Sequence, residues 1–256
     1  MACALVAGLA IADGVESANT VGYSDVSVAA GTFIMIGAQF TKVGAQNIPI
    51  GDLIQGDFAP ATYSKRLTEA PQIQILNAAG TGYTTYYYLS DAEDDEENEV
   101  LGWADGVGDL VTTINLNPGD AVWFKAITAT NLKLKGEVIS GNTKAITVTT
   151  TKADQFSMIA NPFPTTLDIN DITWSGLTPS TYSKRLTEAP QIQVLNAAGT
   201  GYTTYYYIND AEDENEDEVT GWADGVGDLA ETAIGVGKGF WLKLPTAGTV
   251  TATFAL

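Results

Sequence analysis

Short runs of alternating apolar and polar residues recur along the chain. The segments QIQIL (72–76) and QIQVL (191–195) alternate with period two, the pattern of a half-buried strand. Each is followed by NAAGTG, which predicts a hairpin turn, and then by YTTYYY, which predicts the returning strand. Helical patterns are scarce: IPIGDLI (48–54) and LDINDI (167–172) each predict one helical turn. The pattern therefore predicts an all-β protein.

A block of 49 residues occurs twice, 119 positions apart, as 62–110 and 181–229, with seven differences between the copies. The flanks match more weakly: FIMIGAQF resembles FSMIANPF, and PGDAVWFK resembles VGKGFWLK. Each copy thus runs from an opening strand to a closing aromatic strand. This predicts two tandem β-sandwich-like domains from an internal duplication, at 20–136 and 137–256, preceded by a segment 1–19.

The framing strands resemble a repeat of secreted bacterial surface proteins, in which an NPF-type strand opens the domain and a GxGFW-type strand closes it. Asn161-Pro162-Phe163 and Gly237-Lys238-Gly239-Phe240-Trp241 carry this resemblance. The first copy departs from it, with Gln39 in place of the expected Asn-Pro and Ala121-Val122-Trp123 in place of Gly-Phe-Trp. The resemblance covers the frame of each copy and implies export and a β fold, but no enzyme activity.

The chain is strongly acidic, with 31 Asp and Glu against 12 Lys and Arg and a net charge of −19. It therefore repels nucleic acids and anionic membranes and attracts cations or basic surfaces. Histidine is absent and the only cysteine is Cys3, which removes the commonest general base and zinc ligands. No nucleophile triad, phosphate loop or metalloprotease motif occurs, so we expect a protein that is not an enzyme.

The apolar start, MACALVAGLAIADG, ends in a small-x-small pattern typical of a secretory signal, although it lacks the positive charges that usually precede one. It is too short to span a bilayer. The alternatives are a packed or disordered arm, or an arm that adds a strand to a neighbour. We expect a secreted protein, extracellular or at the cell surface, whose mature chain does not insert into a membrane.

Two acidic runs, 91–99 and 210–218, lie within the repeated block. They have three interpretations: a solvated loop that maintains solubility, a calcium site, or a surface that docks on a basic partner. The GWADGVGDL segments that follow favour tight turns but carry further carboxylates. The candidate Ca²⁺ ligands are Asp91, Asp94, Asp105, Asp109, Asp210, Asp213, Asp224 and Asp228.

Two basic pairs stand out in this acidic chain, and each lies inside a repeated block. They are either ordinary partners of nearby acids or contacts to the acidic loop of a neighbouring copy or molecule. The candidate assembly residues are the basic Lys65, Arg66, Lys184 and Arg185 and the acidic Asp94, Glu96, Asp213 and Glu216.

Tyrosines occupy both faces of the predicted strand YTTYYY in each copy. One face belongs in the core, and the other is a candidate for stacking on sugar rings or for a protein interface. The candidate aromatic face consists of Tyr86, Tyr88, Tyr205 and Tyr207.

Together these features favour an extracellular structural protein that self-assembles into a filament or surface layer through repeated β-domain contacts. The alternative is a bivalent carbohydrate- or surface-binding module, with surface glycans as partners. A duplication that has not yet diverged would explain the repeat without any function.

Overall fold

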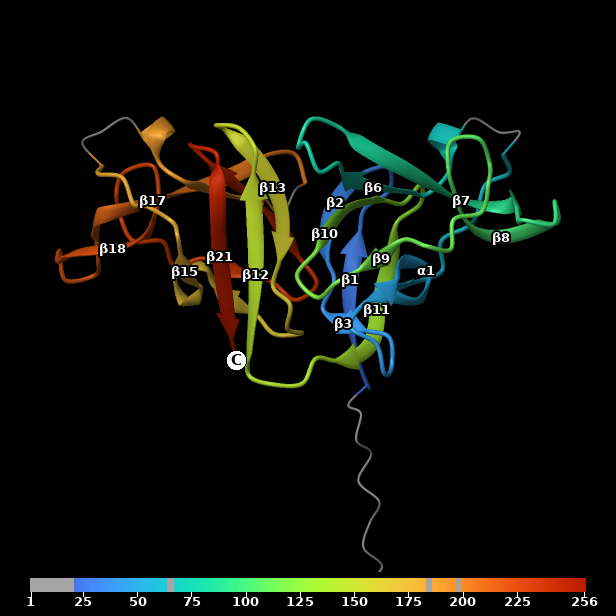
Figure 1. Ribbon diagram of the computed structural model, residues 1–256, viewed down its shortest axis with the longest axis horizontal. Coiled ribbons are helices and arrows are strands. Elements are labelled where there is room, and N and C mark those ends of the chain that lie inside the picture. Colours follow the sequence, from blue (N-terminus) through green and yellow to red (C-terminus); the bar gives the residue numbers. More distant parts are fainter. Residues whose placement is uncertain (1–20, 64–66, 183–185, 197–198) are drawn as a thin grey trace, which may run out of the picture.

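The computed structural model describes residues 21–63, 67–182, 186–196 and 199–256. The described chain is all-β, as predicted, and every named sheet draws its strands from one side of residue 140. We call residues 21–138 the first half and 143–256 the second half; they lie side by side in Figure 1. The helical elements are single turns, α1 (Ile50–Leu53), η1 (Leu67–Glu69), η2 (Ile169–Asp171) and η3 (Leu186–Glu188).

The first half packs a four-stranded sheet on a five-stranded one. The four-stranded sheet contains β1 (Val21–Val28), β3 (Phe40–Thr41), β5 (Ile54–Gln55) and β11 (Thr130–Val138). The five-stranded sheet has the order β2-β10-β6-β7-β8, with bounds Phe33–Gly37, Ala121–Lys125, Gln72–Leu76, Tyr83–Glu93 and Glu99–Ala104. A small pair, β4 (Ile48–Pro49) and β9 (Asn115–Leu116), completes the half. Alternate residues such as Val26, Leu132 and Phe124 fill the core between the sheets.

The second half has an equivalent five-stranded sheet, with the order β13-β20-β16-β17-β18. Its strands span Gln155–Ala160, Gly239–Leu244, Gln191–Leu195, Tyr202–Glu212 and Glu218–Ala223. A three-stranded sheet of β12 (Thr143–Thr150), β21 (Gly248–Ala255) and β15 (Thr173–Ser175) covers it, and β14 (Leu167–Asp168) pairs with β19 (Ala233–Ile234). Phe240, Leu242 and Phe254 are among the buried residues of this core.

The local sequence predictions are confirmed where the structure describes them. The turn 77–82 closes with hydrogen bonds from the Asn77 N–H to the Gly82 carbonyl and from the Gly80 N–H to the Asn77 carbonyl, both 2.9 Å. The two predicted helical turns are α1 and η2. β7 and β17 are longer than YTTYYY, because each continues through the first three residues of the acidic run. β11 ends at Val138 and β12 begins at Thr143.

The two halves meet through the outer faces of their five-stranded sheets. Met35 and Trp123 from the first half pack with Ala160 and Trp241 from the second, and the two indole rings lie 6.2 Å apart. We call this contact the joint. Since all four side chains are at least nine-tenths buried, the joint is a packed interface between the two halves.

Contacts across the joint come in equivalent pairs. The Gly37 N–H donates to the Gly237 carbonyl (3.0 Å), and the Ala160 N–H donates to the Gly119 carbonyl (2.8 Å). Gly37 and Ala160 occupy the same position of the opening strand, as Gly119 and Gly237 do in the turn before the closing strand. The halves therefore face each other across an approximate two-fold axis.

Small residues at the joint are complementary and not identical. A Cβ at Gly37 would lie 2.3 Å from the Cβ of Ala160, and one at Gly239 would lie 2.6 Å from the Cβ of Ala121. Each pair thus joins one glycine to one alanine at equivalent positions. Two identical halves would place either two glycines or two clashing alanines there, which gives a physical reason for the divergence of the flanks.

Candidate functional site

The β7–β8 and β17–β18 hairpins lie at opposite ends of the long axis of the molecule (Figure 1). The first three residues and the last residue of each acidic run are strand, and the loop between them is Asp94–Asn98 or Asp213–Asp217. The Oδ1 of Asp94 accepts hydrogen bonds from the N–H groups of Glu96 and Asn98, both 2.9 Å. Asp213 does the same for Asn215 and Asp217. The loops are therefore ordered by their own carboxylates.

The fourth position of each acidic loop adopts a left-handed backbone conformation, with φ of 61° at Glu97 and 63° at Glu216. A glutamate in this region of φ is uncommon. It sets the tight reversal that projects the carboxylates of the loop, including the candidate assembly residues Glu96 and Glu216, away from the sheet into solvent.

The aspartates of GWADGVGDL form turns, as the sequence favoured. The Oδ1 of Asp105 accepts from the N–H groups of Val107, Gly108 and Asp109 at 2.9–3.1 Å. Asp224 repeats this geometry at 2.8–3.2 Å with residues 226–228. Asp109 and Asp228 sit at the far side of these turns, beside Glu93 and Glu212 of the long strands. These carboxylates organise backbone in the same way as an Asx turn.

Asp91 and Asp210 also bind backbone. Both carboxylate oxygens of Asp91 accept from the Tyr63 N–H (2.8 and 3.0 Å), and Asp210 binds the Tyr182 N–H in the same way. In each half the four candidate calcium ligands are therefore divided between a strand, the acidic loop and the GWADGVGDL turn. Among the described residues, no three His, Cys, Asp or Glu side chains converge on a position that could hold a metal ion.

Hydrogen bonding shifts the titration of the loop aspartates. The backbone N–H of Asn98, followed by that of Glu96, holds the pKa of Asp94 below its ordinary 3.8, and the N–H groups of Asn215 and Asp217 do the same for Asp213. A carboxylate with a lowered pKa in the folded state stabilises the loop above pH 3.8, and this stabilisation is lost as pH falls through the folded value.

We expect NMR titration of the side-chain carboxyl carbons to give midpoints below 3.8 for both aspartates. In Asp94→Asn the amide retains an acceptor but no charge, and we expect the Glu96 and Asn98 amide resonances to lose their acid-dependent shifts. Midpoints at or above 3.8 in the folded protein would contradict this description of the loops.

The four basic assembly candidates, Lys65, Arg66, Lys184 and Arg185, lie outside the described residues. Tyr63 and Tyr182 are the last described residues before them, and both are bound to acidic strand positions. The ion pairs between described residues, Lys42–Asp52 (3.3 Å) and Lys243–Asp154 (2.8 Å), involve none of the loop acids.

The candidate aromatic face packs into the cores. Tyr88 lies edge-on to Phe58, with 4.9 Å between ring centroids, and Tyr86 also packs against the core of the first half. Tyr205 is 9% exposed and its hydroxyl lies 2.5 Å from the Thr232 hydroxyl, while Tyr207 packs on Trp222. Tyr205 is buried and the other three rings are half-buried, so each ring packs at least part of its surface against a core. The period of two along a strand predicts that Tyr86 and Tyr88 share one face. It does not predict which face of the sheet is covered.

Sequence reasoning missed a small apolar patch at each end. Tyr63 is 43% exposed and Val107 66% exposed, and Tyr182 and Val226 have 43% and 67%. The Tyr63 ring covers Gly108, since a Cβ there would lie 3.1 Å from it. We define each end surface as this Tyr–Val pair, the acidic loop and the adjoining outer strand. The near-identity of the two repeated blocks indicated that the chain presents two similar surfaces. It did not indicate that these surfaces lie at the two ends of the molecule.

No helix in the described part of the chain is long and apolar enough to cross a membrane. No protein-family model, curated protein or solved structure matches this chain.

Proposed function

We propose that the chain is an extracellular structural subunit that self-assembles end to end into a filament or layer. One observation carries this proposal: the near-identical blocks provide two similar end surfaces at opposite ends of the molecule, whereas the divergent flanks form the joint (Figure 1). Equal surfaces at the two ends allow each subunit to repeat one contact at both ends, which propagates an assembly.

The outer strand at each end supports such a contact. β8 and β18 are the last strands of their sheets and pair only with β7 and β17 among the named strands. The free edge is limited by the turn that follows, because the Val111 N–H donates to the Trp103 carbonyl (2.8 Å). The first part of β8 remains open and carries Leu101, which is 59% exposed. An open edge with apolar neighbours suits strand addition from a second molecule.

Charge controls the contact in this proposal. Two acidic loops repel each other when two ends approach, so the contact needs positive charge. Lys65 and Arg66 in one block, and Lys184 and Arg185 in the other, supply it by facing the acidic loop of the next molecule. In this proposal calcium between the loops of neighbouring molecules supplies the remainder, since carboxylate oxygens are its usual ligands.

We also infer that the two halves arose by internal duplication and are exported domains. The common strand order of the two five-stranded sheets and the 119-residue spacing of the blocks support the duplication. The strands that carry the surface-protein resemblance, β13 and β20, pair along their full length, as β2 and β10 do in the first half. The apolar start of the sequence supports export.

Electron microscopy of the purified chain, with calcium and with chelator, tests the function. We expect regular filaments or layers, denser with calcium, because the ion screens the loops. An unassembled population of 27.0 kDa particles in every condition would overturn the proposal. Assembly that persists in chelator would assign the contact to the basic pairs alone.

A further inference from the structure

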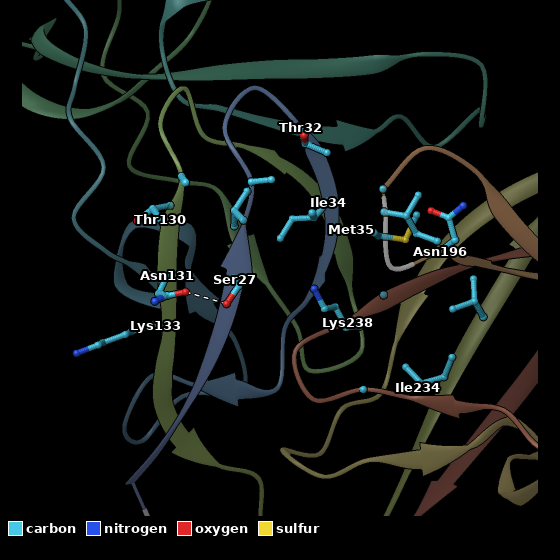
Figure 2. Close-up of a pocket in the computed structure, with 18 of the residues that line it drawn as sticks. Ser27, Thr32, Ile34, Met35, Thr130, Asn131, Lys133, Asn196, Ile234 and Lys238 are labelled. Atoms are coloured by element: carbon cyan, nitrogen blue, oxygen red, sulfur yellow. Dashed lines mark hydrogen bonds between the residues drawn. The ribbon is translucent and has the colours of Figure 1, made fainter.

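A cavity of about 1040 Å³ opens beside the joint, between β1 and β11 of the first half and the β19–β20 turn of the second (Figure 2). The two-fold relation generates a second cavity on the other side of the joint, between the β9–β10 turn and β12, of about 440 Å³. The first is as large as the sites that hold small organic ligands. The two cavities use equivalent elements of opposite halves, so each serves as a comparison for the other.

The cavities differ in charge at one equivalent position. Lys238 precedes the closing strand of the second half and lines the large cavity, whereas Asp120 precedes that of the first half and lines the small one. Both residues bridge to the opposite half, Lys238 to Ile36 and Asp120 to Ile159. The carboxylate of Asp120 is occupied, since it accepts from the backbone and side chain of Asn117 at 2.7 and 3.1 Å.

Lys238 has no such partner. Its ammonium forms no ion pair with any described residue, and burial lowers the pKa of Lys238 below its ordinary 10.5. Figure 2 shows the side chain projecting from the β19–β20 turn toward β1, while Lys133 points away from it. A partly buried cation without a counter-ion favours an anion that enters the cavity, and this local attraction acts against the repulsion from the net charge of −19 on the chain.

The walls around Lys238 combine hydrogen-bonding groups with apolar surface. Ser27 donates to Asn131 at 2.8 Å on one wall, and Asn196 lies on the opposite wall (Figure 2). Val194 and Leu195, both half-buried, add apolar surface. Hydroxyl and amide groups suit sugar hydroxyls, and aliphatic side chains suit the apolar face of a pyranose ring. The one carboxylate in the lining is that of Asp57, which is exposed.

We propose that this cavity binds an acidic saccharide, with the carboxylate of a uronic acid against the ammonium of Lys238. A charge-assisted hydrogen bond of this kind is stronger than a neutral one, and it gains strength where water is partly excluded. The small cavity cannot substitute for it, because Asp120 repels a carboxylate. The site is independent of end-to-end assembly, since both end surfaces lie away from it (Figure 1).

Isothermal titration calorimetry of the full chain with trigalacturonic acid tests this site. The matched probe is its methyl ester, which has the same shape without charge. We expect the acid to bind and the ester to bind at least about tenfold more weakly. Lys238→Gln should bind the acid about tenfold more weakly than the native chain does, and Lys238→Arg should retain most of the affinity. Lys152→Gln changes an exposed position and should bind as the native chain does.

Equal binding of acid and ester, or unchanged binding by Lys238→Gln with an unaltered melting temperature, would overturn the proposal. A tri-glutamate peptide that binds as tightly as the saccharide would overturn the assignment to sugars and leave a general carboxylate site. Electron microscopy of Lys238→Gln separates the two proposals, because we expect its assembly to be unchanged.

Discussion

Gly37→Ala is expected to lower the free energy of unfolding by about 1–3 kcal/mol, the usual cost of overpacking. The new Cβ would lie 2.3 Å from the Cβ of Ala160 and 3.1 Å from the Lys238 carbonyl oxygen, so the joint must open or the strands must shift. Gly37 does not have a positive φ, and alanine is otherwise permitted there. Chemical denaturation measures the loss, and exposure of the buried Trp123 and Trp241 should appear in the fluorescence spectrum.

The exchange of the two residues is the sharper form of this experiment. Ala160→Gly alone should cost less, through one lost methyl contact and a more flexible strand. Gly37→Ala combined with Ala160→Gly restores one glycine opposite one alanine, and we expect it to be more stable than Gly37→Ala alone. Gly248→Ala is the control, since no atom lies within 4 Å of its Cβ position. Strictly additive effects would show that the two positions do not meet.

The joint explains which parts of the fold were predictable from sequence. Alternation in QIQIL and the turn chemistry of NAAGTG are local, and each yielded the observed strand or turn. The pairing of Gly37 with Ala160 is not local, because it depends on two outer sheet faces covering each other. Nothing in a single strand distinguishes an outer face that packs on a second half from one that meets water.

The candidate site shows the same division. Asp105 was expected to belong to a turn, and it does, because an aspartate followed by glycine binds its own backbone. The extent of the acidic strands was not expected, since carboxylates are rare in strands. They are tolerated in β7 because Asp91 binds the Tyr63 N–H and Glu93 pairs with the turn at Asp109. The sequence alone assigned Lys238 no role beyond the closing-strand motif. Its partial burial without an ion-pair partner depends on the packing of the opposite half.

Reversal of charge at one end alone should stop assembly at the dimer. In Lys65→Glu combined with Arg66→Glu, the first end would present only negative charge, while the second end keeps its basic pair and acidic loop. Because the ends are nearly identical, two second ends can still meet reciprocally. Mass photometry should then show particles of twice the 27.0 kDa chain mass in place of long assemblies.

The equivalent variant at Lys184 and Arg185 should give the same dimer through the first ends, and reversal of all four residues should leave monomers. Lys144→Glu combined with Lys152→Glu applies the net-charge change of a single-end variant outside both repeated blocks, and its assembly should match that of the native chain. Filaments that survive reversal of all four residues would remove the basic pairs from the contact. Monomers from either single-end variant would instead indicate that only unlike ends meet, so that the seven differences between the blocks define a direction along the filament.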